Sequence, residues 1–224
     1  MIACLFSGGK DSTLALHKAA AQGYHAELLI TMRPESDASY MFHKPNIDKT
    51  ALQAQAMGIR QVFADTKGEK ELELADLEKA FVENKVSVLI TGAVASNYQR
   101  QRIQAICDRL GIKHIAPLWG IEPMDELIEL AERYHAIITH VSAEGFDRSY
   151  LGARIDAAMI EKLIALNRRY RISLIFEGGE AESFVLDAPL FRKRIEITKS
   201  HIEMEGSTGT YVIDEAVLAD KNPG

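Results

Sequence analysis

The chain has little cysteine: Cys4 and Cys107 are its two thiols among 224 residues. They form no Cys-x-x-Cys pair and no zinc-ligand spacing with the seven histidines. Cys4 lies in an apolar run and Cys107 in a helical pattern, so both are expected to be packing residues. Such sparse cysteine is typical of proteins in a reducing cytoplasm, which is therefore the predicted compartment.

Long hydrophobic runs and an excess of basic residues are also missing. No stretch approaches the ~20 apolar residues that a membrane span requires. The first six residues lead into a glycine loop without a basic leader, which predicts a strand rather than a signal peptide. The net charge is −6, so bulk nucleic-acid binding is not expected. Hydrophobic residues at 47% and charged residues at 26% indicate a globular protein of one large or two small domains.

Short apolar runs alternate with amphipathic stretches through the first half of the chain. The pattern predicts strands over 2–6, 26–31, 61–64, 86–91 and 113–116, and helices over 12–21, 47–57, 69–84 and 97–110. Strands that alternate with helices of this length predict βαβ units and an α/β fold with a parallel sheet. Such a sheet carries its ligands at the carboxyl ends of its strands.

The regular alternation of predicted strands and helices ends near residue 121. Helices are predicted over 123–134 and 156–169, and strands over 136–141, 173–176, 184–186, 192–197, 202–204 and 211–213. We therefore predict two domains, 1–121 and 122–224, the second being a smaller α+β lobe.

A glycine loop follows the first predicted strand and opens the first helix. It consists of Ser7, Gly8, Gly9, Lys10, Asp11 and Ser12. Glycines let backbone N–H groups approach an anion closely, and the helix directs free N–H groups and its positive dipole end to the same place. Hydroxyls and a lysine complete a cradle for phosphate or pyrophosphate. The spacing differs from the Walker A loop and from the dinucleotide-binding G-x-G-x-x-G.

This hexapeptide resembles the signature of the PP-loop, or N-type, ATP pyrophosphatases. The resemblance implies a Rossmann-like domain of the HUP type that binds ATP, with the loop holding the β- and γ-phosphates through Mg²⁺. A substrate oxygen then attacks the α-phosphate, which yields an adenylated intermediate and pyrophosphate. Lys10 and Mg²⁺ would neutralise the departing charge, and Asp11 would orient the loop or help to hold Mg²⁺. As a loop lysine that is solvated before the ligand binds, Lys10 is expected to be dispensable for folding, so that Lys10→Ala loses turnover alone.

Three further segments, over 40–43, 92–102 and 177–190, resemble the diphthine–ammonia ligase family, and with the loop they cover the chain nearly end to end. The resemblance implies conversion of ATP, ammonium and diphthine to diphthamide, AMP and pyrophosphate. The protein substrate would be translation elongation factor 2, and a homodimer is left open. A paralogue acting on another acid would carry the same motifs.

Residues from these segments make chemical sense of that reaction. Gly92 and Ala93 end a strand at the same sheet edge as the loop, so their backbone can line the nucleotide site. Arg100 and Arg102 face apart by ~200° on a helix, and Arg100, nearer the helix start, is favoured to reach the α-phosphate. A solvated basic face is the alternative for both arginines.

Acids and aromatic residues complete the candidate site. The carboxylates of Glu177, Glu180 and Glu182 can bind Mg²⁺, hold ammonium or accept its proton. Glu180 can instead face the quaternary ammonium of diphthine, with cation–π attraction from Tyr98 or Trp119. A surface hairpin is the alternative for the acids. Tyr40 is a candidate for the adenine or substrate pocket, and His43 for phosphate binding or base catalysis, although packing explains a loop histidine equally well.

Rival functions use the same loop. Thiolation of tRNA relies on catalytic or cluster-binding cysteines, which Cys4 and Cys107 do not readily supply. A tRNA-lysidine type of ligase is disfavoured by the acidic balance. A non-catalytic nucleotide sensor would bind ATP but release no pyrophosphate.

Overall fold

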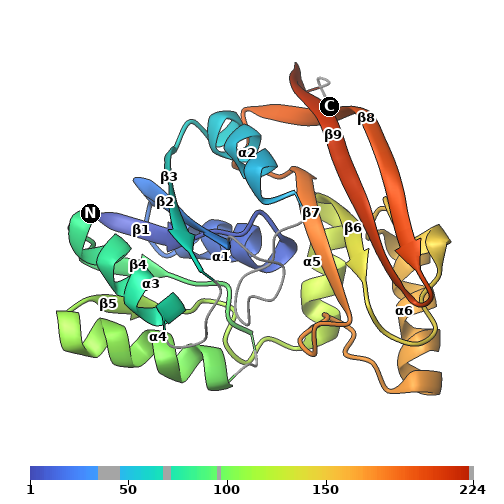
Figure 1. Cartoon of the computed structure of the whole chain (residues 1–224), viewed down its shortest axis with the longest axis horizontal. Coiled ribbons are helices and arrows are strands. Elements are labelled where there is room, and N and C mark those ends of the chain that lie inside the picture. Colours follow the sequence, from blue (N-terminus) through green and yellow to red (C-terminus); the bar gives the residue numbers. More distant parts are fainter. Residues whose placement is uncertain (35–45, 68–71, 95–96, 222–224) are drawn as a thin grey trace. The chain divides into compact units, whose positions relative to one another are not determined.

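The computed structural model describes residues 1–34, 46–67, 72–94 and 97–221 (Figure 1). The chain divides into two compact units. Unit 1 consists of Met1–Ser7 and Asp11–Gly120, and unit 2 of Gly8–Lys10 and Ile121–Gly224. The glycine loop therefore belongs in part to each unit.

Unit 1 is built on a five-stranded sheet in which the four pairs of neighbouring strands are parallel. Its strands are β1 (Ile2–Leu5), β2 (Leu28–Pro34), β3 (Arg60–Thr66), β4 (Val88–Ile90) and β5 (Lys113–Ile115). Its helices are α1 (Lys10–Ala21), the 3-10 turn η1 (Ile47–Lys49), α2 (Thr50–Met57), α3 (Leu72–Glu83) and α4 (Asn97–Leu110). The predicted parallel α/β architecture is confirmed.

The sheet of unit 1 is held between apolar helix faces. Leu28, Ile30 and Leu89 from the strands are fully buried, and they cluster with Phe81 of α3 and Ile106 of α4. Parallel strands buried on both faces read as continuous apolar runs, which is why their sequence pattern is strong.

Strand order places β1 at the centre of the sheet. The order β3-β2-β1-β4-β5 means that the chain builds outward from β1 on one side through β2 and β3, then returns to build on the other side. The point where the direction reverses lies between β1 and β4. In open parallel sheets this reversal leaves a crevice at the carboxyl ends of the two strands, where ligands bind.

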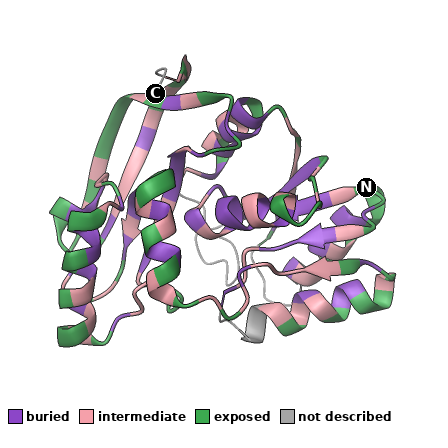
Figure 2. Ribbon diagram, turned by 180° about the vertical axis from the view of Figure 1, so that it is seen from behind, coloured by how far each residue is buried: buried purple, intermediate pink, exposed green. Residues whose placement is uncertain are grey.

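Unit 2 contains a four-stranded sheet in the order β7-β6-β9-β8, antiparallel at each pairing. Its elements are α5 (Pro123–Arg133), β6 (His135–Val141), η2 (Arg148–Tyr150), α6 (Ala157–Tyr170), β7 (Ala181–Asp187), β8 (Lys193–Glu205) and β9 (Thr208–Asp220). Helix α6 starts at a cap in which the Asp156 side chain accepts the N–H of Met159. Figure 2 shows buried residues along one side of α6 and exposed residues along the other. The predicted α+β character of this half is confirmed.

The strand predicted over 173–176 is wrong. Phe176 has a φ of 66°, in the left-handed region, and its N–H donates to Ser173 O while Gly179 N–H donates to Phe176 O. These short-range bonds close a turn, which is incompatible with extended backbone. The segment is apolar because Ile175 and Phe176 are buried, not because it pairs in a sheet.

The tail has fewer and longer strands than predicted. The segments predicted over 192–197 and 202–204 belong to one strand, β8, which pairs with β9 around Gly206. Irregular register around Lys199 lets the strand continue through a polar stretch that interrupts the apolar alternation.

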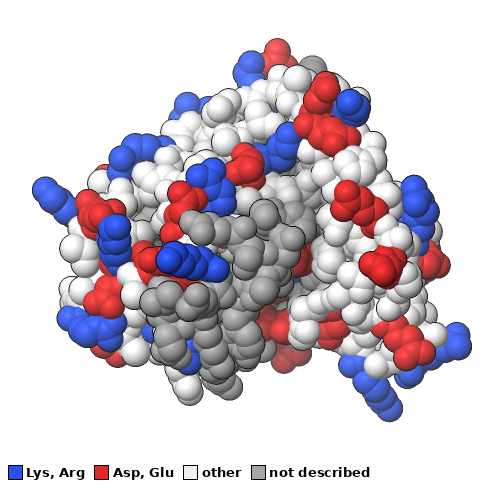
Figure 3. Space-filling view, viewed as in Figure 1, with Lys and Arg blue, Asp and Glu red and all other residues white. Residues whose placement is uncertain are grey.

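The surface of the described residues is mixed in charge. Figure 3 shows acidic and basic side chains interspersed among uncharged residues over the described part of one face. Among the described residues, no helix has the length and apolar character to cross a membrane.

Candidate functional site

The glycine loop lies at the carboxyl end of β1, as the sequence predicted. Gly8 has a φ of 79°, a conformation that glycine adopts without strain and that turns the chain into α1. The Ser7 and Ser12 hydroxyls lie 3.3 Å apart, and the Ser7 N–H points to Ser12 Oγ at 3.4 Å. Asp11 stands in the first turn of α1, half-buried. Two hydroxyls and a helix N-terminus thus gather at one point in unit 1, which is an arrangement that favours an anion.

The end of β4 presses against the start of α1. A Cβ built on Gly92 would lie 2.7 Å from Asp11 C and 2.7 Å from Ser12 N, which are backbone atoms that no rotamer change can move. Only glycine fits at this close approach. Gly92 and Ala93 therefore lie beside the helix N-terminus, where they were predicted to line the nucleotide site.

A partly buried polar network holds Thr91, the residue before Gly92. Thr91 Oγ1 lies 2.8 Å from His114 Nε2, and His114 Nδ1 lies 2.8 Å from Gln104 Oε1. An amide oxygen only accepts, so Nδ1 carries the proton and Nε2 accepts from the hydroxyl. Burial, followed by the charge of Arg100, lowers the pKa of His114, in keeping with a neutral ring. Sequence reasoning missed these residues because nothing in their spacing reveals the contact.

This network predicts a pH dependence of stability. Because the folded-state pKa of His114 lies below its ordinary value of 6.5, the unfolded chain binds the proton more readily. The stabilising contribution is present above pH 6.5 and is lost as the pH falls toward the folded-state pKa. We expect the melting temperature to fall between pH 7 and pH 5, and to fall less steeply in His114→Gln.

His114 is not the sole source of the expected pH dependence. Burial also lowers the pKa of His135, so the melting temperature should still fall with pH, in the same direction, when His114 is replaced. His25→Gln, at an exposed side chain, serves as the control and should follow the wild-type curve. Equal slopes for His114→Gln and wild type would contradict the neutral network.

Arg100 has a defined position in unit 1. Its guanidinium carbon lies 4.0 Å from the centroid of the Trp119 ring, as expected for a cation–π pair. The half-buried guanidinium thus occupies one face of Trp119, so that face is not open to a quaternary ammonium. Both residues were candidates from sequence, but their mutual contact was not foreseen.

Residues 8–10 are hydrogen-bonded to β7, the edge strand of the sheet in unit 2. Val185 N–H donates to Gly8 O at 3.0 Å, and Lys10 N–H donates to Ser183 Oγ at 3.0 Å. One of the amides predicted to face an anion is therefore engaged by a serine hydroxyl. Ser183 was quoted in a motif but was not predicted to contact the loop.

Lys10 is not the solvated loop lysine that the sequence predicted. Its side chain is 1% exposed, and Nζ lies 2.8 Å from Oε1 of Glu126, which is 0% exposed. Nζ also lies 5.7 Å from the centroid of the Phe176 ring. The premise of a solvated side chain is therefore wrong. Because a buried charge loses its compensation when its partner is removed, we now expect Lys10 to contribute to folding as well.

Glu126 gave no sequence signal of its own. It lies in the first turn of α5 (Pro123–Arg133), where an acidic residue is favoured by the helix dipole and needs no further explanation. The signal that was available is its apolar setting, since Leu127 and Leu130 of the same helix are buried too. A carboxylate on a buried helix face requires a cation nearby.

The three predicted acids lie in different settings around β7. Both carboxylate oxygens of Glu180 accept backbone N–H groups, Oε1 from Ser173 at 2.6 Å and Oε2 from Gly178 at 2.9 Å. Glu180 therefore closes the turn that leads into β7. Glu177 is exposed on that turn, and Glu182 is half-buried in β7 opposite His140 of β6.

Some predicted residues lie outside the described part of the chain. Tyr40 and His43 fall in 35–45, and the side chain of Tyr98 is not described either. Among the described residues, no group of three or more His, Cys, Asp or Glu side chains is arranged to hold a metal ion.

The two cysteines are buried packing residues, as predicted. Both are free and fully buried. Burial raises the pKa of Cys4 far above its ordinary value and that of Cys107 to about 11. Protonated, inaccessible thiols make poor nucleophiles, which weakens the case for a thiolating enzyme.

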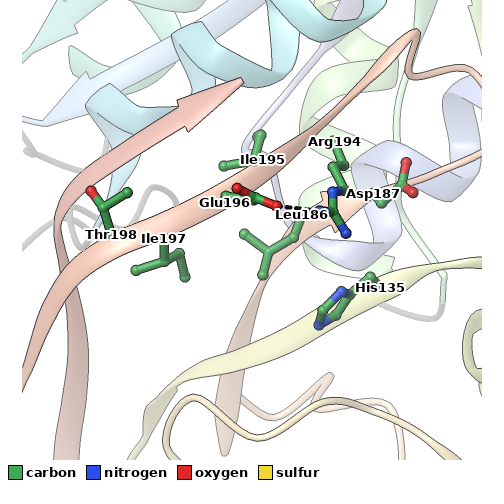
Figure 4. A pocket seen from close by; sticks show the side chains of 8 residues that line it. All are labelled: His135, Leu186, Asp187, Arg194, Ile195, Glu196, Ile197 and Thr198. Carbon is green, nitrogen blue, oxygen red and sulfur yellow. Dashed lines mark hydrogen bonds and ion pairs between the residues drawn. The ribbon is translucent and has the colours of Figure 1, made fainter. Parts of the chain in front are cut away.

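A separate pocket of about 390 Å³ opens in unit 2 (Figure 4). It is lined by His135, Leu186, Asp187 and residues 194–198. Its charged groups pair with described residues: Arg194 bonds to Glu196, and Asp187 lies 2.7 Å from Lys221 Nζ.

Comparison with known proteins identifies the family. Models of the diphthamide synthase N-terminal and C-terminal domains match residues 1–114 and 122–219. The diphthine–ammonia ligase of Homo sapiens is 32% identical over 90% of this chain and 84% of its own length. The diphthine–ammonia ligase of Rattus norvegicus is 33% identical over 89% and 83%, and that of Schizosaccharomyces pombe is 31% identical over 97% and 39%.

Among solved structures, a predicted subunit of tRNA methyltransferase from Methanocaldococcus jannaschii aligns with 84% of this chain and 97% of that chain. It shares 17% identity and has a TM-score of 0.43, which is a low likeness. The two domain models and the curated relatives agree with each other and with the resemblance seen in the motifs. The chain belongs to the diphthine–ammonia ligase family.

Proposed function

We propose that this protein is an ATP-dependent ligase that amidates the carboxylate of diphthine on translation elongation factor 2. Ammonium is the nitrogen source, and the products are diphthamide, AMP and pyrophosphate. The single observation that carries the ATP part is the close approach of Gly92 to Asp11 and Ser12. It brings the end of β4 against the start of α1, which follows β1, at the point where a sheet of this topology binds its ligand. Family membership supports the acceptor and the nitrogen source.

The proposed reaction has two steps. A carboxylate oxygen of diphthine attacks the α-phosphorus of ATP, and the bond from that phosphorus to the β-phosphate oxygen breaks, which releases pyrophosphate. Ammonia then attacks the acyl carbon of the adenylate, and the bond to AMP breaks. The nitrogen loses a proton as the amide forms. Adenylation makes the second step feasible because AMP leaves more readily than an oxide ion.

The glycine loop and residues of unit 1 supply binding and orientation in this proposal. Gly8 and Gly9 allow the backbone to approach the phosphates, and the hydroxyls of Ser7 and Ser12 donate to phosphate oxygens. Gly92 and Ala93 line the nucleotide. Arg100, stacked on Trp119, stands ready to contact the α-phosphate, where its planar guanidinium would hold two oxygens at once.

We propose that Mg²⁺ binds together with the nucleotide and is not held by protein side chains alone. Mg²⁺ is commonly bound through one or two carboxylates together with substrate phosphates and water. Asp11, half-buried at the start of α1, is a carboxylate of that kind. When bound, the ion would neutralise charge on the phosphates as pyrophosphate departs.

Acids near β7 are proposed to serve the acceptor and ammonia. Glu177 is exposed and is the best placed of the three to exchange ligands with solvent. Glu182 remains a candidate to accept the proton from ammonia. Glu180, whose two oxygens accept backbone N–H groups, acts through the shape of the turn. We propose that residues 1–121 bind ATP and that 122–224 bind the acceptor, in the cytoplasm.

The proposal is tested by incubating diphthine-bearing elongation factor 2 with the enzyme, ATP, Mg²⁺ and ammonium. We expect pyrophosphate release that requires both ammonium and the acceptor, together with a fall in the mass of the acceptor as a hydroxyl is replaced by an amine. A nucleotide sensor would bind ATP without releasing pyrophosphate. A thiolating enzyme would ignore ammonium, so release that is independent of ammonium would refute the assignment.

A further inference from the structure

Glu126, the buried partner of Lys10, has no part in the reaction as proposed so far. Both side chains belong to unit 2, their charged atoms lie 2.8 Å apart, and they are 1% and 0% exposed. Burying two charges is strongly unfavourable unless each compensates the other. A glycine loop that only had to bind phosphate would have no need of such a carboxylate.

The position of the Lys10 ammonium has a direct consequence for ligand binding. A group that is 1% exposed cannot contact a phosphate arriving from solvent, so Nζ has to leave its present position to reach one. The main chain of the loop is anchored at Gly8 O and Lys10 N by hydrogen bonds to β7. The movement therefore falls to the side chain, a flexible stem of four carbons that changes rotamer readily.

We infer that Glu126 is a competing counter-ion, which holds Lys10 in the nucleotide-free protein and yields it to the triphosphate. This inference rests on the proposed function. The lysine charge then has a partner in both states, at Oε1 of Glu126 without nucleotide and at phosphate oxygens with it. This competition lowers the affinity of the protein for the nucleotide, because the binding-competent state, in which Lys10 is released from Glu126, is a minor fraction of the free protein.

Competition of this kind selects for ligands with many negative charges. A triphosphate brings enough charge to displace the carboxylate, whereas AMP brings less and lacks the β- and γ-phosphates. After pyrophosphate has left, Lys10 returns to Glu126 and AMP loses a binding contact. Glu126 is thus a positioning residue that discriminates substrate from product without touching either.

The test is a calorimetric titration of Glu126→Gln with a nonhydrolysable ATP analogue and Mg²⁺, and separately with AMP. The amide keeps the shape of the side chain but removes its charge. We expect the analogue to bind about tenfold more tightly than to wild type, because the competent fraction rises. AMP should bind with unchanged affinity. In turnover, KM for ATP should fall while kcat does not rise.

Controls separate the possible outcomes. Glu132→Gln removes an exposed carboxylate from the same helix and should bind both ligands as wild type does. If Glu126→Gln does not fold, Glu126→Asp keeps the charge but draws it back by one carbon, and a smaller tightening is expected. Unchanged affinity for the analogue, or equal tightening of analogue and AMP, would overturn the inference. Wild-type protein that binds no analogue would instead overturn the proposed function.

Discussion

Replacement of Gly92 by alanine is expected to reduce turnover by about 100-fold or more, since a displacement of about 1 Å at a reacting centre costs that much. The added methyl group would lie 2.7 Å from backbone atoms of Asp11 and Ser12. Neither backbone atom can rotate away, so the end of β4 and the start of α1 must separate. Over-packing of this kind costs about 1–3 kcal/mol of stability. Nucleotide affinity, measured by calorimetry, should fall together with pyrophosphate release.

The matched control is Gly111→Asn, at the end of α4 in the same unit. Gly111 has a φ of 67°, which asparagine tolerates, and a Cβ there would meet nothing within 4 Å. This variant should retain wild-type nucleotide binding. The backbone of Gly92 is not in the left-handed region. Any loss of nucleotide affinity in Gly92→Ala is therefore due to the steric clash with α1 and not to backbone strain. Wild-type affinity in Gly92→Ala would mean that ATP binds elsewhere.

Replacement of Lys10 by alanine is expected to abolish turnover and also to destabilise the protein. Removing one partner leaves the Glu126 carboxylate buried without its cation, which typically costs about 3–5 kcal/mol. We expect a clear fall in the denaturant midpoint, followed by circular dichroism. Because the chain forms two units, midpoints are a safer comparison than a single free energy of unfolding.

The double variant Lys10→Met/Glu126→Leu separates folding from catalysis. With both charges gone, no uncompensated ion remains and apolar side chains fill the space, so most of the lost stability should return. Turnover should stay absent, because the lysine is missing. Lys79→Ala, at an exposed ion pair on α3, should change the midpoint little. A Lys10→Ala protein as stable as wild type would show that the pair does not form in solution.

Much of unit 1 could be predicted from sequence because its signals are local. Buried parallel strands read as apolar runs, and glycines mark the helix ends, as at Gly58 with a φ of 69°. The glycine loop was recognisable because phosphate binding demands particular residues at consecutive positions. Helix 97–110 was predicted with the bounds of α4.

The errors came from features that depend on distant residues. Phe176 and its neighbours are apolar in sequence, but the oxygens of Glu180 fold them into a turn. The sequence does not show whether Lys10 is solvated or buried, because its partner lies 116 positions away in the chain. The apolar face of α5 shows that Glu126 needs a cation nearby, but neither periodicity nor spacing identifies Lys10 as that cation. The same holds for Glu180 and Arg100, because the residues that they contact, which the sequence does not reveal, determine their roles.

The hydrogen bonds between residues 8–10 and β7 limit where the protein can be cut into separately expressed fragments. A fragment that begins at residue 121 would leave the outer edge of β7 bare at Val185, where the amide now donates to Gly8. Exposed strand edges recruit other chains and lead to aggregation. Residues 8–10 therefore protect the edge of the second sheet, and a fragment cut at residue 121 would lose that protection.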